Sequence, residues 1–229
     1  DNDTAGFTVV QSGGSTSVAE TGTTDTFTVV LNAQPASNVV ISVTSGDTGE
    51  ATVSPATLTF TSGNWNSAQT VTVTGVNDSI IDGTITSTIT IAVNDASSDN
   101  NFDSVADQTV SVTTTDDDTA GFTIAQTGGS TSVNESGTTD TFTIVLTGRP
   151  TSDVVLSITS GDTGEATVTS ALTFTSANWN SAQTVTVTGA DDNLVDGTQT
   201  STLTISIVDA VTDDNFDGVA DQTVSATTT

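Results

Sequence analysis

The residues of this chain that can do chemistry are almost all carboxylates. Its 229 residues include 28 Asp and Glu against a single Lys or Arg, with no His and no Cys, so the formal net charge is −27. The sequence therefore lacks the usual general base, the commonest transition-metal ligand and any thiol nucleophile. The hard oxygen groups that remain suit Ca²⁺, which takes about six to eight oxygen ligands. We expect a calcium-binding protein that is not an enzyme.

The same charge balance excludes several classes of partner. The one basic residue, Arg149, cannot neutralise the several phosphates of a nucleic-acid site. An anionic membrane surface would repel the chain, and no apolar run approaches the ~20 residues of a spanning helix. We therefore expect neither nucleic-acid binding nor direct membrane insertion. The absence of Cys also excludes disulfides and zinc–thiolate sites.

The acidic residues form three kinds of grouping. One is the run of three residues Asp116, Asp117 and Asp118. The second is the turn after the segment VTVTG, at 76–82 and again at 190–196. Isolated Asp residues are common in turns because they cap their own backbone. Three consecutive carboxylates repel one another unless a counter-ion is present, so we interpret this run and the 76–82 turn as parts of a calcium site.

The third grouping is DNNFDSVAD at 99–107 and DDNFDGVAD at 213–221, and it leaves two interpretations open. Its oxygens alternate as at the start of an EF-hand loop, but the bidentate Glu of that loop is missing. Alternatively, Phe102 and Phe216 anchor a turn into the core. The additional metal-ligand candidates are Asp99, Asn101, Asp103 and Asp107 in the first copy, and Asp213, Asn215, Asp217 and Asp221 in the second.

An internal repeat divides the chain into two copies. TAGFT at 4–8 returns at 119–123, and NWNSAQTVTVTG at 64–75 returns at 178–189. A nearly constant offset over the whole chain indicates two autonomous β-domains, since solenoid units are only about 20–50 residues long. We place the domains at 1–117 and 118–229. The opening DNDTAG resembles the junction between them, so we expect the chain to be an excerpt from a longer array.

Within each copy, apolar residues alternate with Thr and Ser. Phe27, Val29 and Leu31 fall on one face of a strand, for example, and Ile89 and Ile91 share a face of another. Short alternating segments separated by Gly, Asn, Asp and Ser predict a sandwich of seven or eight strands, the immunoglobulin-like number. No segment has helical spacing of useful length. The predicted class is all-β, with two tandem immunoglobulin-like β-sandwich domains in an elongated arrangement.

Each copy has one Trp, Trp65 or Trp179, in the segment NWNSAQ. A loop Trp can stack on a sugar, as in a carbohydrate-binding module, or it can close one end of the hydrophobic core. We favour the second interpretation because buried aromatic residues dominate core energetics.

Taken in order, these motifs resemble the Calx-beta-like immunoglobulin-like repeats of bacteria. Both copies contain V-x-E-x-G, T-F-x-x-x-N-W and V-T-V-x-G-x-x-D, and D-D-D-T-A-G joins them. Such repeats form the extender regions of very large repeats-in-toxin (RTX) adhesins exported by type I secretion. The resemblance covers both copies and implies a secreted or cell-surface protein. It implies a monomeric rod whose partners are neighbouring repeats of the same polypeptide.

The resemblance also implies calcium ligands at one end of each sandwich, with Ca²⁺ as the cofactor. In the family they come from the V-x-E motif, a middle-loop Asp, a D-D-x-I-x-E loop and the acids that end the domain. In the first copy the corresponding residues are Glu20, Asp47, Asn77, Asp78, the carbonyl of Ile80, Asp82, Asp116, Asp117 and Asp118. Asn77 and Asp82 depart from the family's Asp and Glu. In the second copy they are Glu135, Asp162, Asp191, Asp192, the carbonyl of Leu194 and Asp196, a set expected to be partial without a terminal run of Asp.

The function implied is a spacer, stiffened by Ca²⁺, that projects distal adhesive domains for attachment and biofilm formation. Two alternatives stay open: a carbohydrate- or surface-binding module that uses the Trp loop, and a Ca²⁺-sensing Calx-beta domain. A spacer predicts a Ca²⁺-dependent shape, and a lectin predicts that replacing Trp65 and Trp179 by Ala abolishes binding. A sensor predicts micromolar affinity, whereas extracellular modules bind Ca²⁺ at ~10⁻⁴–10⁻³ M.

Overall fold

The computed structural model describes residues 2–229, and its contacts divide the chain into two compact units. Unit 1 comprises the chain up to Asp78 together with Gly83–Asp117. Unit 2 comprises Ser79–Asp82 and Asp118–Thr229. The four residues Ser79–Asp82 belong to the first sequence copy, yet they pack with unit 2, a difference from the expected boundary that no local sequence pattern indicates.

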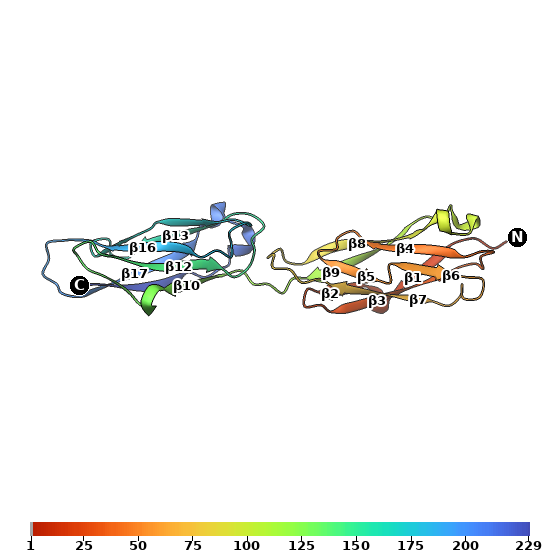
Figure 1. The fold of residues 1–229 in the computed structure, drawn as a ribbon, viewed down its shortest axis with the longest axis horizontal. Helices are drawn as coiled ribbons and strands as arrows, with labels where there is room; N and C mark the ends of the chain where they lie inside the picture. The colour runs from red at the N-terminus through yellow and green to blue at the C-terminus, as the bar shows by residue number, and fades with distance from the viewer. Residues whose placement is uncertain (1) are drawn as a thin grey trace. The chain divides into compact units, whose positions relative to one another are not determined.

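Unit 1 is a sandwich of a four-stranded sheet and a five-stranded sheet (Figure 1). The strand orders are β1-β3-β7-β5 and β2-β9-β8-β4-β6. All pairs are antiparallel except β2 with β9, which run parallel. The strands are β1 (Phe7–Gln11), β2 (Thr16–Ala19), β3 (Thr24–Leu31), β4 (Val39–Ser45), β5 (Ala51–Ser54), β6 (Thr57–Phe60), β7 (Gln69–Gly75), β8 (Ile85–Val93) and β9 (Gln108–Thr115).

Unit 2 repeats this topology strand for strand. Its sheets have the orders β10-β12-β16-β14 and β11-β18-β17-β13-β15, and β11 runs parallel to β18. The strands are β10 (Phe122–Gln126), β11 (Thr131–Val133), β12 (Thr139–Leu146), β13 (Val154–Ser160), β14 (Ala166–Val168), β15 (Ala171–Phe174), β16 (Gln183–Gly189), β17 (Gln199–Ile207) and β18 (Gln222–Thr228).

The predicted alternation of buried and exposed residues is confirmed. Phe27, Val29 and Leu31 of β3 are buried, and so are Ile89 and Ile91 of β8. These side chains meet between the two sheets of unit 1 in one hydrophobic cluster. The matching residues of unit 2 form an equivalent cluster. The all-β, sandwich class predicted from the sequence is therefore correct.

Each unit has nine strands rather than seven or eight, because its first strand is broken in two. Gly13 and Gly14 take positive φ values of 64° and 85°, which residues with a Cβ rarely adopt. This break sends β1 into the four-stranded sheet and β2 into the five-stranded sheet. Gly128 and Gly129 do the same between β10 and β11.

The helical segments of the described residues are all three-residue 3₁₀ turns. None of the described helices is long and apolar enough to cross a bilayer. The turns are η1 (Ser12–Gly14), η2 (Asp95–Ser97), η3 (Asn100–Phe102), η4 (Thr127–Gly129), η5 (Asp209–Val211) and η6 (Asp214–Phe216).

Candidate metal centre

Glu20 lies at one end of unit 1, directly after β2, and it is almost completely buried. Its backbone N–H donates to the carbonyl of Thr115 at the end of β9, at 3.0 Å. A Cβ on Gly75 would lie only 2.1 Å from the carbonyl oxygen of Ala19. The glycine that ends β7 therefore allows the chain before Glu20 to lie directly against it.

Glu50 reaches the same end of unit 1 from the turn before β5. Its carbonyl accepts a hydrogen bond from Val76, directly after β7, at 2.9 Å. A carboxylate oxygen of Glu20 lies within 4.8 Å of one from Glu50 and within 4.8 Å of one from Asp116. Glu20 therefore lies close to carboxylates from two distant points of the sequence.

The run of Asp residues is held beside this cluster by hydrogen bonds within unit 1. Asp116 accepts from the backbone N–H of Gly83 at 2.9 Å. The side-chain amide of Asn77 donates to Asp117 at 3.1 Å. Glu20, Asn77 and Asp117 also line an open hollow of ≈ 480 Å³. The end of β9 and the turn after β7 therefore lie side by side.

Unit 2 has a corresponding cluster of Glu165, Asp192 and Asp196. Carboxylate oxygens of these three residues lie within 4.8 Å of one another. Glu165, the counterpart of Glu50, is 5% exposed, and its carbonyl accepts from Ala190 after β16 at 2.8 Å. Asp196 also lines a hollow of ≈ 310 Å³ together with Glu135. Glu50 and Glu165 are equivalent in the repeat, whereas the other two carboxylates of the unit 2 cluster come from the turn after β16.

The electrostatics of Glu165 are unfavourable without a cation. Burial raises the pKa of its carboxyl group, and the nearby carboxylates of Asp196 and Asp192, followed by those of Asp162 and Glu135, raise it further. The buried Oε2 atom accepts no hydrogen bond from the described residues. A buried carboxylate without a donor is costly, so these residues fit a bound cation that would supply the missing positive charge.

The two middle-loop Asp residues predicted as ligands are not members of the carboxylate clusters. Asp47 is exposed and accepts a hydrogen bond from the N–H of Gly49, at 3.0 Å, within its own turn. Asp162 is exposed likewise and accepts from Gly164. The clusters instead contain Glu50 and Glu165, which our sequence reasoning missed. The available signal was a Glu that stands, in both copies, directly before the first buried residue of a strand.

The other predicted ligands differ in how far they are exposed to solvent. Asp78 is half-buried in unit 1. In unit 2, Asp82, Asp118 and Glu135 are half-buried, whereas Asp191 and Leu194 are exposed. Ile80 forms an isolated parallel bridge with Arg149.

The loop with alternating oxygens is closed by its own hydrogen bonds. Asp99 accepts from the backbone N–H groups of Ala36 at 2.7 Å, Ser37 at 2.8 Å and Asn101 at 3.0 Å. The N–H groups of Asn101 and Ser37 hold the pKa of this carboxyl group below its ordinary value, against the opposing effect of burial. These donors occupy the oxygens that a metal ion would need, so the geometry gives Asp99 a structural role.

The second copy of this loop has the same arrangement. Asp213 accepts from the hydroxyl of Thr151 at 2.6 Å and from the N–H of Ser152 at 2.7 Å. Although burial opposes it, these hydrogen bonds and that of Asn215 keep the pKa of Asp213 low. Phe102 and Phe216 are buried beneath the two loops, as the alternative interpretation expects. The remaining candidates of this grouping, Asp103, Asp107, Asp217 and Asp221, are exposed.

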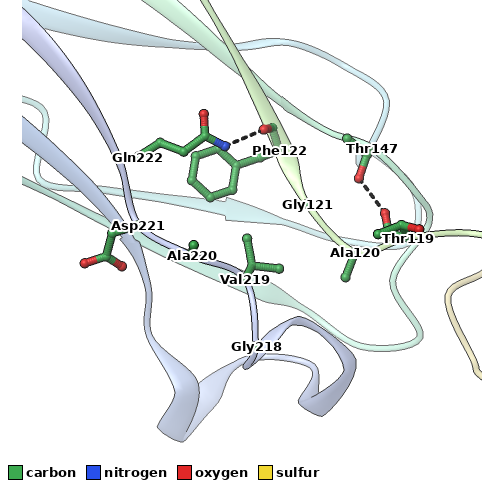
Figure 2. Close-up of a pocket in the computed structure, with 10 residues that line it drawn as sticks. All are labelled: Thr119, Ala120, Gly121, Phe122, Thr147, Gly218, Val219, Ala220, Asp221 and Gln222. Carbon is green, nitrogen blue, oxygen red and sulfur yellow. Dashed lines mark hydrogen bonds between the residues drawn. The ribbon is translucent and has the colours of Figure 1, made fainter.

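A separate pocket of ≈ 470 Å³ in unit 2 opens beside the start of β10 (Figure 2). Its polar groups are engaged: Gln222 donates to the carbonyl of Phe122 at 2.7 Å, and Thr147 donates to that of Thr119 at 2.8 Å. Asp221 lies at its edge with the carboxylate turned away from Thr147 (Figure 2). The pocket therefore offers no group of carboxylates comparable to the clusters.

Both Trp side chains are partly buried and pack against the hydrophobic clusters of their units. The carbonyls of Trp65 and Trp179 accept from the N–H groups of Leu31 and Leu146, each at 3.2 Å. The Trp loops therefore cover the ends of β3 and β12, and this packing does not favour a sugar-stacking role.

No family model matches the chain, and neither does any curated protein sequence. Among solved structures, CBD12 from CALX1.2 has 14% identity and a TM-score of 0.35 over 86% of this chain and 79% of that one. The calcium binding domain CBD12 of CALX1.1 has 13% identity and a TM-score of 0.32 over 87% and 80%. Domains 4 and 5 of the S-layer protein SbsC have 16% identity and a TM-score of 0.36 over 97% and 96%. Likenesses this weak carry no inference about family or function.

Proposed function

We propose that this chain is a calcium-binding structural module. The observation that carries the proposal is the buried Glu165. One of its carboxylate oxygens accepts no hydrogen bond from residues 2–229, and carboxylate oxygens of Glu165, Asp192 and Asp196 lie within 4.8 Å of one another. Evolved proteins keep buried charges paired or bound to a metal, because an isolated one is costly. The chain's single basic residue leaves little else to balance 28 acidic ones.

The donor set favours Ca²⁺ over other cations. Every candidate ligand offers oxygen, which suits hard cations, and Ca²⁺ accepts flexible geometries with several carboxylates. In unit 2 the holding residues would be Glu165, Asp192 and Asp196, and in unit 1 Glu20, Glu50 and Asp116. A bound ion would supply positive charge where turns and strand ends meet, and so would tie these elements together.

The finer proposal is that the module acts as a spacer of a secreted bacterial adhesin, stiffened by Ca²⁺. Its support is the tandem repeat, the acidic clusters at the strand ends and the resemblance of the motifs to RTX extender repeats. In such a role the neighbouring repeats of the polypeptide are the partners, and the cell surface is the location. Calcium would act by limiting the motion of loops that adjoin the junction.

Calcium uptake by the full chain tests the binding proposal. We expect isothermal titration to show Ca²⁺ binding that Glu165→Gln weakens or removes in part. Asp153→Asn removes one charge from an exposed position outside the clusters and should leave binding unchanged. If Glu165→Gln and Asp153→Asn bind Ca²⁺ as the wild type does, the proposed site is wrong.

The spacer role is tested separately by small-angle scattering. We expect one narrow distribution of interatomic distances in Ca²⁺ buffer and a broader one in chelator. Replacing Asp116, Asp117 and Asp118 by Asn should broaden the distribution in Ca²⁺ as well. Identical distributions in both buffers would leave calcium binding intact and would rule out stiffening.

A further inference from the structure

Three buried hydroxyl groups find no hydrogen-bond partner among residues 2–229. They are those of Ser87, Thr114 and Ser201. These residues are 7%, 0% and 2% exposed, so bulk solvent does not reach their oxygens. Ser201 is the counterpart of Ser87 in the repeat, so the feature occurs in both units.

Other buried hydroxyl groups of the chain are satisfied. Thr16, which is 2% exposed on the neighbouring strand β2, donates to Oε1 of Gln11 at 2.9 Å. Thr212, which is 8% exposed, donates to the carbonyl of Val155 at 3.3 Å. A buried polar group without a protein partner is costly, and in native structures it commonly contacts an ordered water molecule.

The hydroxyl groups of Ser87 and Thr114 lie on the inner face of one sheet of unit 1. In the register of β8 and β9, Ser87 is opposite Val112 and Thr114 is opposite Ile85. The two residues are therefore diagonal neighbours, whose Cα atoms lie about 7–8 Å apart with their Cβ atoms somewhat closer. One molecule that forms two hydrogen bonds of about 2.8 Å can join oxygens at such a separation.

This pair of hydroxyl groups lies between the hydrophobic core and the carboxylates. On the core side, Ile89 and Val110 are buried opposite each other. On the other side, Thr114 pairs with Val18 of β2, and Glu20 follows Val18 by two residues. Side chains two residues apart in an extended chain point to the same face, so the hydroxyl groups lie one step inside Glu20.

Unit 2 places its equivalent hydroxyl groups beside a glutamate as well. Thr228, the counterpart of Thr114, donates to the carbonyl of Glu165 at 3.2 Å. Ser201 makes no such bond, like Ser87 in unit 1. In unit 1 the hydroxyl group of Thr114 is also without a protein partner, so both members of the pair need another one.

The chemistry of the pair selects water as its ligand. Each hydroxyl group can both donate and accept a hydrogen bond, and so can water. A buried water molecule typically makes about three hydrogen bonds and needs two to four polar partners. An apolar ligand would leave both hydroxyl groups unpaired, and Ca²⁺ prefers about six to eight oxygens, several of them from carboxylates.

We propose that unit 1 binds one internal water molecule between the hydroxyl groups of Ser87 and Thr114. The water accepts a hydrogen bond from one hydroxyl group and donates one to the other, and its second hydrogen is directed toward the carboxylate layer of Glu20. An equivalent water molecule contacts Ser201 in unit 2. This site goes beyond the calcium-binding role, because it needs no bound ion.

A double-mutant cycle tests the shared water molecule. Ser87→Ala and Thr114→Val remove the two hydroxyl groups at nearly constant shape. Urea unfolding of the full chain in chelator excludes any contribution of calcium. Trp179→Phe serves as the background, so that the fluorescence of Trp65, which packs against the core of unit 1, reports the unfolding of that unit.

Each single substitution is expected to raise the unfolding constant of unit 1 about fivefold, the usual worth of one hydrogen bond. The double variant should be no less stable than either single variant, because the first substitution already releases the water. Without a water molecule, removal of an unpaired hydroxyl group would lower the unfolding constant, and the two effects would multiply. Such a result would overturn the proposal.

The matched control is Ser111→Ala with Thr86→Val. These residues form a diagonal pair on the exposed outer face of the same two strands, and their effects should be small and independent. A crystal structure of the chain in chelator gives the direct observation. We expect one density peak within about 2.5–3.0 Å of both inner hydroxyl oxygens. If that density is absent, or if the two hydroxyl groups bond directly to each other, the proposal is wrong.

Discussion

At the scale of single residues, the molecule's charges take two opposite roles that the sequence does not distinguish. Asp99 is surrounded by backbone N–H donors, which lower the pKa of its carboxyl group. Glu165 lies among other carboxylates, and burial raises the pKa of its carboxyl group. The first residue stabilises the metal-free fold when ionised, whereas the second destabilises it.

Glu165→Gln is therefore expected to stabilise the chain in chelator at neutral pH. A raised pKa means that the contribution of protonated Glu165 is present at low pH and lost as pH rises through that pKa. Gln cannot ionise, so the variant avoids the loss. Urea unfolding in chelator measures the difference against Asp153→Asn, which has the same net charge. In Ca²⁺ the order should reverse, and a Glu165→Gln variant that is less stable than Asp153→Asn in chelator would contradict this account.

Asp99→Asn is expected to destabilise the chain at neutral pH and to do so less in acid. Because the pKa of Asp99 is lowered, its contribution is present above the ordinary value of about 4 and is lost as pH falls through the lowered pKa. The midpoints of urea unfolding at neutral pH and at about pH 3 give the difference in stability between the variant and the wild type. Asp103→Asn, exposed in the same loop, is the control. A difference that stays constant with pH would be evidence against the hydrogen-bonding role.

At the scale of strands, glycines decide how the carboxylates are brought together. The Gly13–Gly14 break moves β2 into the five-stranded sheet, and β2 leads directly to Glu20. Gly189, like Gly75, lets a neighbouring segment of the backbone lie directly against it. A Cβ at Gly189 would lie 2.0 Å from the carbonyl oxygen of Asn134. The break acts on the residues that directly follow it, whereas the close approach at Gly75 and Gly189 acts on residues far away in the sequence.

Gly189→Ala is expected to destabilise unit 2 by at least ~1–3 kcal/mol, the usual cost of overpacking, because backbone atoms cannot move aside easily. It should also weaken Ca²⁺ binding by displacing the turn after β16. The matched control is Gly218→Ala, whose added Cβ would meet nothing within 4 Å. Thermal unfolding of both variants gives the comparison. Equal stabilities would show that the strands tolerate a wider separation.

At the scale of the whole molecule, the net charge of −27 opposes folding through self-repulsion. Both units reduce the cost by leaving most acidic groups exposed in turns and by covering the outer strand faces with Thr and Ser. Among the buried acidic residues, Asp99 and Asp213 are surrounded by hydrogen-bond donors, whereas Glu20, Glu50 and Glu165 lie beside other carboxylates. At these glutamates a bound divalent cation would contribute most to the stability of the folded chain.

Calcium is therefore expected to raise the melting temperature of the full chain. A ligand that binds only the folded state stabilises it by ~2.7 kcal/mol at a hundredfold excess over Kd. Calorimetry in Ca²⁺ and in chelator measures the shift. NaCl of equal ionic strength controls for simple screening of the net charge. Melting curves that coincide after this matching would rule out specific binding.

The sequence by itself determined the strands, their buried faces and the twofold repeat. Alternation is a local property, so Phe27, Val29 and Leu31 had to share a face whatever the sheet order. The tertiary structure alone decided that Glu50 and Glu165, rather than Asp47 and Asp162, join the clusters. It also decided that β1 and β2 enter different sheets and that Ile81 packs beside Gly148. These outcomes depend on how turns direct side chains and on how closely distant backbones approach, and neither property is encoded within a few neighbouring residues.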